Sequence, residues 1–158
     1  MSEGRNDRGF SKDELETLAC VLDHLVPASE DGKLPGAGRV GVAAVVDEAL
    51  HRMPEVRGMV AQGLSALEAL AGRRSSRAFA TLPRDQQAEL LNELAASEHA
   101  FPPILLLHVY NGYYQQGPVL EALGLEPRPP HPLGYEMKPN DLRMLDRVRR
   151  RGRLYRDC

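Results

Sequence analysis

A proline-dense stretch close to the C-terminal end constrains the fold of this 158-residue chain more than any other feature. Each of its prolines holds the backbone φ angle near about −65° and removes one hydrogen-bond donor. The residue before a proline is also driven toward an extended conformation. Four of these prolines lie close together, namely Pro127, Pro129, Pro130 and Pro132. Residues 117–135 therefore cannot be helical over most of their length, and we predict a stiff, polyproline-like strap.

The tyrosines of the chain all lie in its last third, on either side of this strap: Tyr110, Tyr113, Tyr114, Tyr135 and Tyr155. Tyrosine combines a large apolar ring with a polar tip and is enriched where one protein covers another. A stiff extended segment also needs a surface to lie on. Together these features favour a docking surface over a catalytic centre.

The composition is that of a globular protein, with 42% hydrophobic and 27% charged residues. No apolar run approaches eighteen residues, so we expect no membrane insertion. Cys20 and Cys158 are too few for a disulfide framework or a thiolate metal site. The N-terminus has no apolar stretch and no adjacent arginine pair, which predicts a cytoplasmic chain. The periplasm is expected instead if the chain is exported with a partner or if a leader was trimmed.

Positive charge gathers at the C-terminal end. The formal net charge is −2, yet residues 143–156 contain seven arginines and a single acidic residue, Asp146. Arginine clusters bind the carboxylates of proteins or the phosphates of nucleic acids. The acidic remainder and the lack of a recognisable groove-reading motif favour a protein partner, with nucleic-acid binding kept as an alternative.

Apolar periodicity predicts five helices and no strand. Ser11 and Glu14 form a capping box at the start of the first helix, and Pro27 ends that helix. The five helices are predicted over residues 12–26, 37–53, 54–72, 83–94 and 104–114, and a further short helix over about 140–148. The expected fold is all-α, a small five-helix bundle with an extended proline-rich C-terminal arm. We expect a disordered N-terminus over 1–10, the bundle over 11–116, and a partner-binding arm over 117–158.

The fifth helix is apolar around most of its circumference, and only His108, Asn111 and Gly112 form a polar sector. Such a helix is either the central rod of a bundle or is covered on its outer side by another molecule. A ligand-binding module or enzyme centred on His108, with Asn111 and Tyr110, is an alternative. A histidine satisfied by a carbonyl or by Asn111 is the favoured interpretation.

Other candidate sites are weak. Gly36-Ala-Gly38 lacks the third glycine and the preceding strand of a dinucleotide site, so we interpret it as a helix start. No general base flanks Cys20, which argues against a catalytic thiol. The five histidines lack metal-binding spacings: His24, His51, His99, His108 and His131. We therefore predict no catalytic, cofactor-binding or metal-binding residue in this chain.

Several short motifs together resemble the gluconate 2-dehydrogenase subunit 3 family. The N-terminal markers are Leu25-Val-Pro27 and Pro35-Gly-Ala37. The C-terminal markers are Gly112-Tyr-Tyr114, Pro130-His-Pro-Leu-Gly-Tyr135, Asp141-Leu142 and Leu154-Tyr-Arg156. The resemblance covers most of the chain.

This resemblance implies a non-catalytic small subunit that stabilises, folds or assembles a large FAD-dependent oxidoreductase of the glucose-methanol-choline type. The expected substrate of that complex is a sugar, polyol or glycoside. FAD is expected in the partner subunit, and a cytochrome subunit accompanies the pair in some complexes. Many members carry a twin-arginine signal, which this sequence lacks. The predicted partner contacts are Tyr113, Tyr114, Pro130, His131, Pro132, Tyr135, Tyr155 and Arg156.

Overall fold

Helices and the segments between them make up the chain in a computed structural model that describes residues 9–97, 101–129 and 131–152. No strand occurs in these residues, which confirms the all-α prediction for the part of the chain that is described. The chain divides into two compact units, Met1–Arg128 and Pro129–Cys158. No helix in the described ranges is both long enough and apolar enough to cross a membrane.

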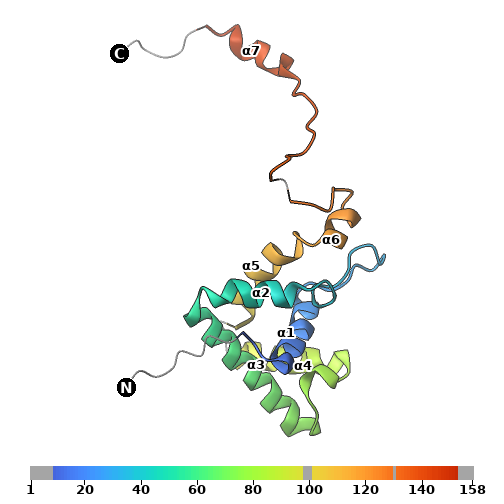
Figure 1. Cartoon of the computed structure of the whole chain (residues 1–158), viewed down its shortest axis with the longest axis vertical. Coiled ribbons are helices and arrows are strands. Elements are labelled where there is room, and N and C mark those ends of the chain that lie inside the picture. Colours follow the sequence, from blue (N-terminus) through green and yellow to red (C-terminus); the bar gives the residue numbers. More distant parts are fainter. Residues whose placement is uncertain (1–8, 98–100, 130, 153–158) are drawn as a thin grey trace. The chain divides into compact units, whose positions relative to one another are not determined.

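The first unit holds the helices α1 to α6 (Figure 1). Their bounds are α1 Lys12–Leu25, α2 Val42–His51, α3 Pro54–Ser75, α4 Arg84–Ser97, α5 Phe101–Tyr113 and α6 Gly117–Ala122. Two short 3-10 helices connect them, η1 Ala37–Arg39 and η2 Phe79–Thr81. The unit thus has one α-helix more than the five predicted, and its last residue is Arg128.

The start of α1 follows the prediction. The Glu14 N–H donates to Ser11 Oγ at 3.3 Å, and the Ser11 N–H donates to Glu14 Oε2 at 2.8 Å. Phe10 is buried just before this cap, and its N–H donates to Asp47 Oδ1 at 3.1 Å. The Arg57 guanidinium lies 4.3 Å from the centre of the Phe10 ring. Of the predicted disordered N-terminus over 1–10, Gly9 and Phe10 are described and Phe10 is buried, whereas residues 1–8 lie outside the described residues.

Glycines interrupt the predicted helix 37–53 and divide it into η1 and α2. Gly41 has a φ angle of 79°, a left-handed conformation that favours glycine and starts α2 in a new direction. Gly38 lies directly against α1, where its N–H donates to Asp23 Oδ1 at 2.7 Å. The interpretation of Gly36-Ala-Gly38 as a helix start is confirmed, since η1 begins at Ala37.

The core of the first unit lies where α1, α2, α3 and α5 meet. Helix α4 packs on α3, and the η2 turn closes the space between α3 and α1. The largest fully buried side chains come from each of these elements, and they include Tyr113, Phe79, Leu18, Leu22, Leu50, Leu64, Leu67, Leu90 and Leu105. Burial of this many leucines and aromatics is the main stabilising contribution to the unit.

The structure describes Pro129 and residues 131–152 of the second unit. It contains a turn at 131–133, a non-helical stretch to Asp141, and two short helical segments. These segments are η3 Leu142–Leu145 and α7 Asp146–Arg149, and together they occupy the place of the short helix predicted over about 140–148. We call residues 131–152 the arm.

Candidate partner-binding surface

Helix α5 has one buried face and one exposed apolar face. Leu105, Val109 and Tyr113 are buried at four-residue spacing. The opposite side carries Leu107, Tyr110 and Tyr114, which are 65%, 44% and 50% exposed. We call these three residues the α5 stripe. Of the two interpretations of this apolar helix, the structure therefore excludes a rod that is buried all round within the first unit.

Contacts on the inner face fix the rotation of α5 about its axis. Gly112 faces α2 so closely that a Cβ atom there would lie 3.1 Å from Val42 Cγ1. The Tyr113 hydroxyl donates to the Pro35 carbonyl at 2.7 Å. Burial, and then the neighbouring Tyr114, raises the pKa of Tyr113. Because the inner face is held at these points, the α5 stripe is directed away from the core.

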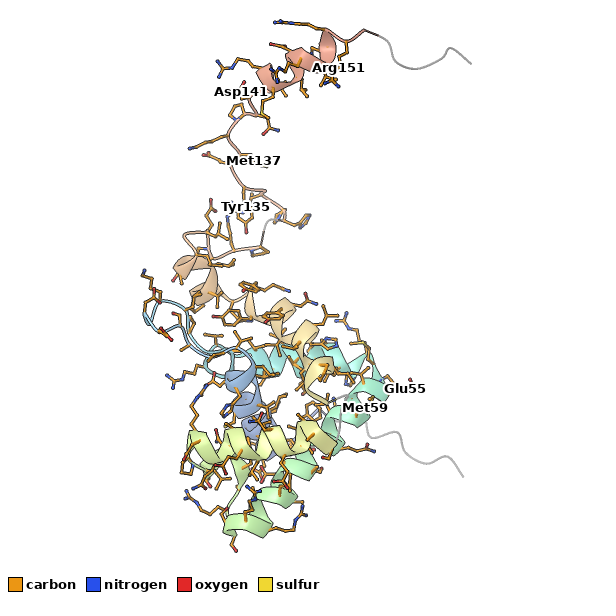
Figure 2. All side chains as sticks on the ribbon, turned by 180° about the vertical axis from the view of Figure 1, so that it is seen from behind. Glu55, Met59, Tyr135, Met137, Asp141 and Arg151 are labelled. Atoms are coloured by element: carbon orange, nitrogen blue, oxygen red, sulfur yellow. The ribbon has the colours of Figure 1, made fainter. Side chains whose placement is uncertain are left out.

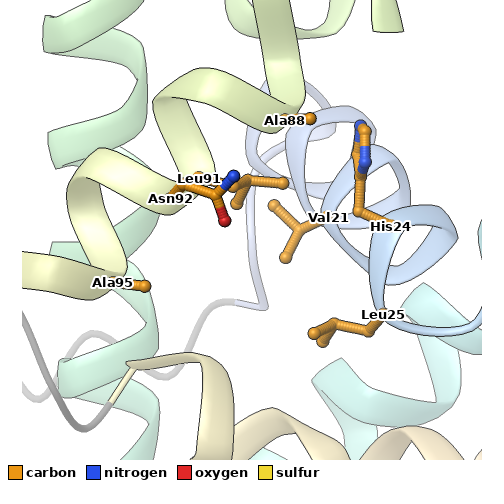
Figure 3. A pocket seen from close by; sticks show the side chains of 7 residues that line it. All are labelled: Val21, His24, Leu25, Ala88, Leu91, Asn92 and Ala95. Carbon is orange, nitrogen blue, oxygen red and sulfur yellow. The ribbon is translucent and has the colours of Figure 1, made fainter. Parts of the chain in front are cut away.

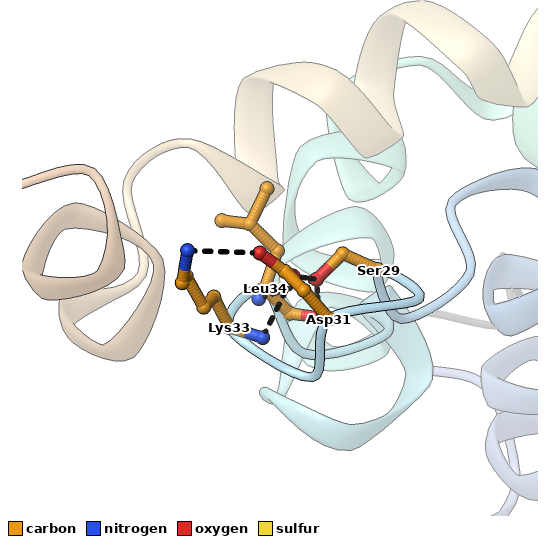
Figure 4. A network of polar contacts seen from close by, with 4 residues as sticks. All are labelled: Ser29, Asp31, Lys33 and Leu34. Atoms are coloured by element: carbon orange, nitrogen blue, oxygen red, sulfur yellow. Dashed lines mark hydrogen bonds and ion pairs between the residues drawn. The ribbon is translucent and has the colours of Figure 1, made fainter.

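The loop before Pro35 is itself ordered by polar contacts (Figure 4). Ser29 Oγ donates to Asp31 Oδ1 at 2.6 Å, and the Lys33 ammonium lies 3.1 Å from Asp31 Oδ2. The Leu34 N–H donates to Ser29 Oγ at 2.9 Å. The hydrogen bond from Ser29, followed by those from Lys33, lowers the pKa of Asp31. This network holds the loop that presents the Pro35 carbonyl to Tyr113.

Aromatic rings at the C-terminal end of α5 contact one another. Tyr113 and Tyr114 meet edge to face with ring centres 5.3 Å apart, and Tyr110 stacks on Tyr114 at 6.2 Å. Tyr113, one of the predicted partner contacts, is only 2% exposed, so its ring belongs to the core of the first unit. Its role is to support Tyr114, which is exposed as a partner contact would require.

The arm exposes large apolar side chains along its described length (Figure 2). Leu133, Met137 and Met144 are each more than four-fifths exposed, at 81%, 85% and 81%. The predicted contacts His131, Pro132 and Tyr135 are exposed residues of this unit. Three other predicted contacts lie outside the described residues, namely Pro130, Tyr155 and Arg156.

Carboxylates in the interior of the first unit make structural hydrogen bonds. Asp47 accepts from the Arg57 guanidinium at 2.9 Å as well as from the Phe10 N–H. Glu68 accepts from the Thr17 hydroxyl at 2.5 Å and from the Phe79 N–H at 3.1 Å. These partners tie α1, α2, α3 and η2 together. Within the described ranges, no group of three or more acidic, histidine or cysteine side chains is placed to hold a metal ion.

A groove between α1 and α4 is a feature that the sequence did not indicate. It has a volume of about 310 Å³, and its lining is Val21, His24, Leu25, Ala88, Leu91, Asn92 and Ala95 (Figure 3). His24 Nε2 lies 3.1 Å from Gln87 Oε1, and Gln87 Nε2 donates to the Phe79 carbonyl at 3.1 Å. The amide oxygen of Gln87 is therefore the acceptor and His24 Nε2 the donor. His24 thus links α1 to α4 and η2.

The structure gives little support to the alternative hypothesis of a ligand-binding or catalytic site centred on His108. His108 is half-buried and Asn111 is exposed. Helical residues two apart point about 200° away from each other, so His108 and Tyr110 cannot converge on one ligand. In the described part of the chain, no hydrogen bond joins His108 to Asn111.

The described residues form helices and loops, their interior carboxylates make structural hydrogen bonds, and helix α5 exposes an apolar, aromatic side. This combination is typical of a component of a larger assembly. Residues 12–128 match the family model described as "Gluconate 2-dehydrogenase subunit 3", and the chain belongs to that family. A family of subunits implies a complex of several chains. Neither the curated proteins nor the solved structures compared with the chain gave a match.

The family match ends at Arg128, which is also the last residue of the first unit. The markers Leu25-Val-Pro27, Pro35-Gly-Ala37 and Gly112-Tyr-Tyr114 lie within it. Two of these markers meet in space, because Tyr113 donates to the carbonyl of Pro35. The remaining markers, from Pro130 onward, lie beyond the matched residues.

Proposed function

We propose that this chain is a non-catalytic small subunit that stabilises, folds or assembles a large FAD-dependent oxidoreductase of the glucose-methanol-choline type. The complex acts on a sugar, polyol or glycoside, and the large subunit binds FAD. Membership of a dehydrogenase subunit family supports this proposal. The observation that carries it is the α5 stripe, an apolar aromatic face presented by an otherwise well-packed bundle.

The α5 stripe is large enough to form the centre of a protein–protein contact. Burying a large apolar side chain contributes about 1.5–3 kcal/mol relative to leaving it exposed. Leu107, Tyr110 and Tyr114 together therefore provide several kcal/mol of driving force before the costs of association. The rings are already held in contact with each other, so ordering them on binding costs little conformational entropy.

Co-expression tests the proposal. The chain, carrying an affinity tag, is produced together with a large FAD-dependent oxidoreductase of the glucose-methanol-choline type from the same genome, and the purified material is examined for flavin absorbance. We expect a yellow complex that oxidises its substrate, and a colourless, inactive product when the tagged chain is produced alone. Substrate oxidation by the isolated chain would show that the proposal is wrong.

A matched pair of variants tests the surface itself. Leu107→Asp places a charge in the middle of the α5 stripe, and we expect it to lower the amount of co-purified flavoprotein at least about tenfold. Met59→Asp makes the same chemical change at an exposed apolar residue of α3, which is 41% exposed, and should leave co-purification unchanged. Equal yields from the two variants would exclude the α5 stripe as the contact.

A further inference from the structure

The helical end of the arm has an apolar ridge. Leu142, Leu145 and Val148 recur every three residues and are 54%, 45% and 56% exposed. In a 3-10 helix, residues three apart lie one above the other, so Leu142 and Leu145 are aligned along η3. Val148 continues this line in α7. We call these three residues the arm ridge.

The same segment carries positive charge that its own acids do not neutralise. Arg143 pairs with Asp141 at 2.7 Å, and Arg149 with Asp146 at 3.4 Å. The other arginines of this segment are Arg147, Arg150 and Arg151. Over the described residues, these three make no ion pair. The arm therefore offers a surplus of guanidinium groups, each of which can bind a carboxylate through two parallel hydrogen bonds.

The stretch before the arm ridge is not helical, and this decides which class of partner fits. From Gly134 to Asp141 the chain has no regular secondary structure, and Tyr135 and Met137 are exposed there (Figure 2). Water can satisfy the exposed N–H and C=O groups of such a stretch, so a surface that displaces this water has to offer polar partners in its place. The hydrocarbon region of a membrane cannot supply such partners, whereas a protein groove can.

We infer that residues 135–151 bind in a groove on the large subunit that has an apolar floor and a rim bearing carboxylates. The floor receives Tyr135, Met137 and the arm ridge, and the rim receives Arg147, Arg150 and Arg151. This inference rests on the proposed function and adds to it the chemistry of a second contact. That contact lies outside residues 12–128, the part of the chain that defines the family.

A competition experiment on full-length chains tests the arm. The large subunit carries the tag, and wild-type and variant small subunits of different mass are produced together in excess over it. Mass spectrometry of the purified complex then gives the ratio in which they bind. We expect the variant with Arg147, Arg150 and Arg151 replaced by glutamate to be bound about tenfold less than wild type. This preference should weaken in about 1 M salt, where charges on the surface are screened.

The control changes the net charge equally, but on the helical unit, by replacing three exposed arginines with glutamate: Arg52, Arg73 and Arg77. It should compete as wild type does. A second pair of variants tests the arm ridge. Leu145→Ser removes an apolar side chain of the ridge and should reduce binding several-fold. Met144→Ser changes an 81% exposed residue that lies off the ridge and should leave binding unchanged.

The outcomes separate this inference from the proposed function. If wild type forms no complex with the flavoprotein, the proposed function fails. If wild type binds but the arginine variant and its control compete equally, the large subunit does not use the arm and the inference is overturned. Arginine-dependent sedimentation of the full chain with phosphatidylglycerol vesicles, together with an unchanged competition ratio, would overturn it in favour of a membrane contact.

Discussion

The close approach of Gly38 to α1 gives a sharp test of how the bundle packs. An alanine Cβ at this position would lie 2.1 Å from the Ala19 carbonyl oxygen and 2.9 Å from its carbonyl carbon. Such atoms essentially never come closer than 3.0 Å. Both neighbours belong to the α1 backbone and cannot rotate away. Gly38→Ala therefore has to separate η1 from α1 by about 1 Å.

The cost of this separation can be worked out from the contacts it disturbs. Forcing extra volume into a packed region costs about 1–3 kcal/mol. The hydrogen bond from the Gly38 N–H to the Asp23 carboxylate, 2.7 Å long, is strained as well, and a bond of this kind contributes about 1.5–3 kcal/mol. We expect the free energy of unfolding to fall by about 3 kcal/mol, a large part of the about 5–15 kcal/mol that typically stabilises a domain.

Urea denaturation followed by circular dichroism measures this effect, with Gly58→Ala as the control. Gly58 is an exposed residue within α3, and apart from its chain neighbours and the nearby backbone of its own helix no atom lies within 4 Å of an added Cβ. The same substitution there should raise the free energy of unfolding by about 0.5–1 kcal/mol, because alanine favours helix. If Gly38→Ala were as stable as wild type, the contact between η1 and α1 could not be as close as described.

Three further predictions concern the side chains of Tyr113 and Cys20. Tyr113→Phe removes the hydrogen bond to Pro35 and should lower the free energy of unfolding by about 1 kcal/mol in urea denaturation. Because burial raises the pKa of Tyr113, wild-type stability should also fall as the pH rises above about 10, and Tyr113→Phe should lack this part of the fall. Burial, followed by Asp23, raises the pKa of Cys20. In a Cys158→Ser variant, the rise in the alkylation rate of Cys20 should occur at a higher pH in the folded chain than in the chain unfolded in urea. Rate-against-pH curves that coincide for the two states would contradict this.

The elements with strong local signals could be predicted from the sequence. Ser11 and Glu14 specify the start of α1, and the third helix begins at Pro54 as expected. Helix α6 was missed because Gly117 and Pro118 were interpreted as the beginning of the strap, although proline is favourable in the first turn of a helix. The break between η1 and α2 depends on Gly41, whose left-handed conformation a sequence alone does not reveal.

The candidate surface could be predicted only in part. The sequence indicated that α5 is apolar nearly all round, but not which side faces the core. Leu105, Val109 and Tyr113 share one face by their spacing, and so do Leu107 and Tyr114. The choice between the two faces is made by Gly112 against α2 and by the Tyr113 hydroxyl on a distant carbonyl. Long-range contacts of this kind leave no local pattern, and neither does the groove beside His24.

The α5 stripe also has a consequence for the cell that makes this chain. A band of leucine and tyrosine facing water is the kind of surface that holdase chaperones and proteases recognise, and it promotes self-association. Copies synthesised in excess should therefore be short-lived, and if the proposed large subunit covers the α5 stripe, their level should follow the supply of that subunit. Exposure of the α5 stripe would then keep the amount of this chain matched to the amount of its partner.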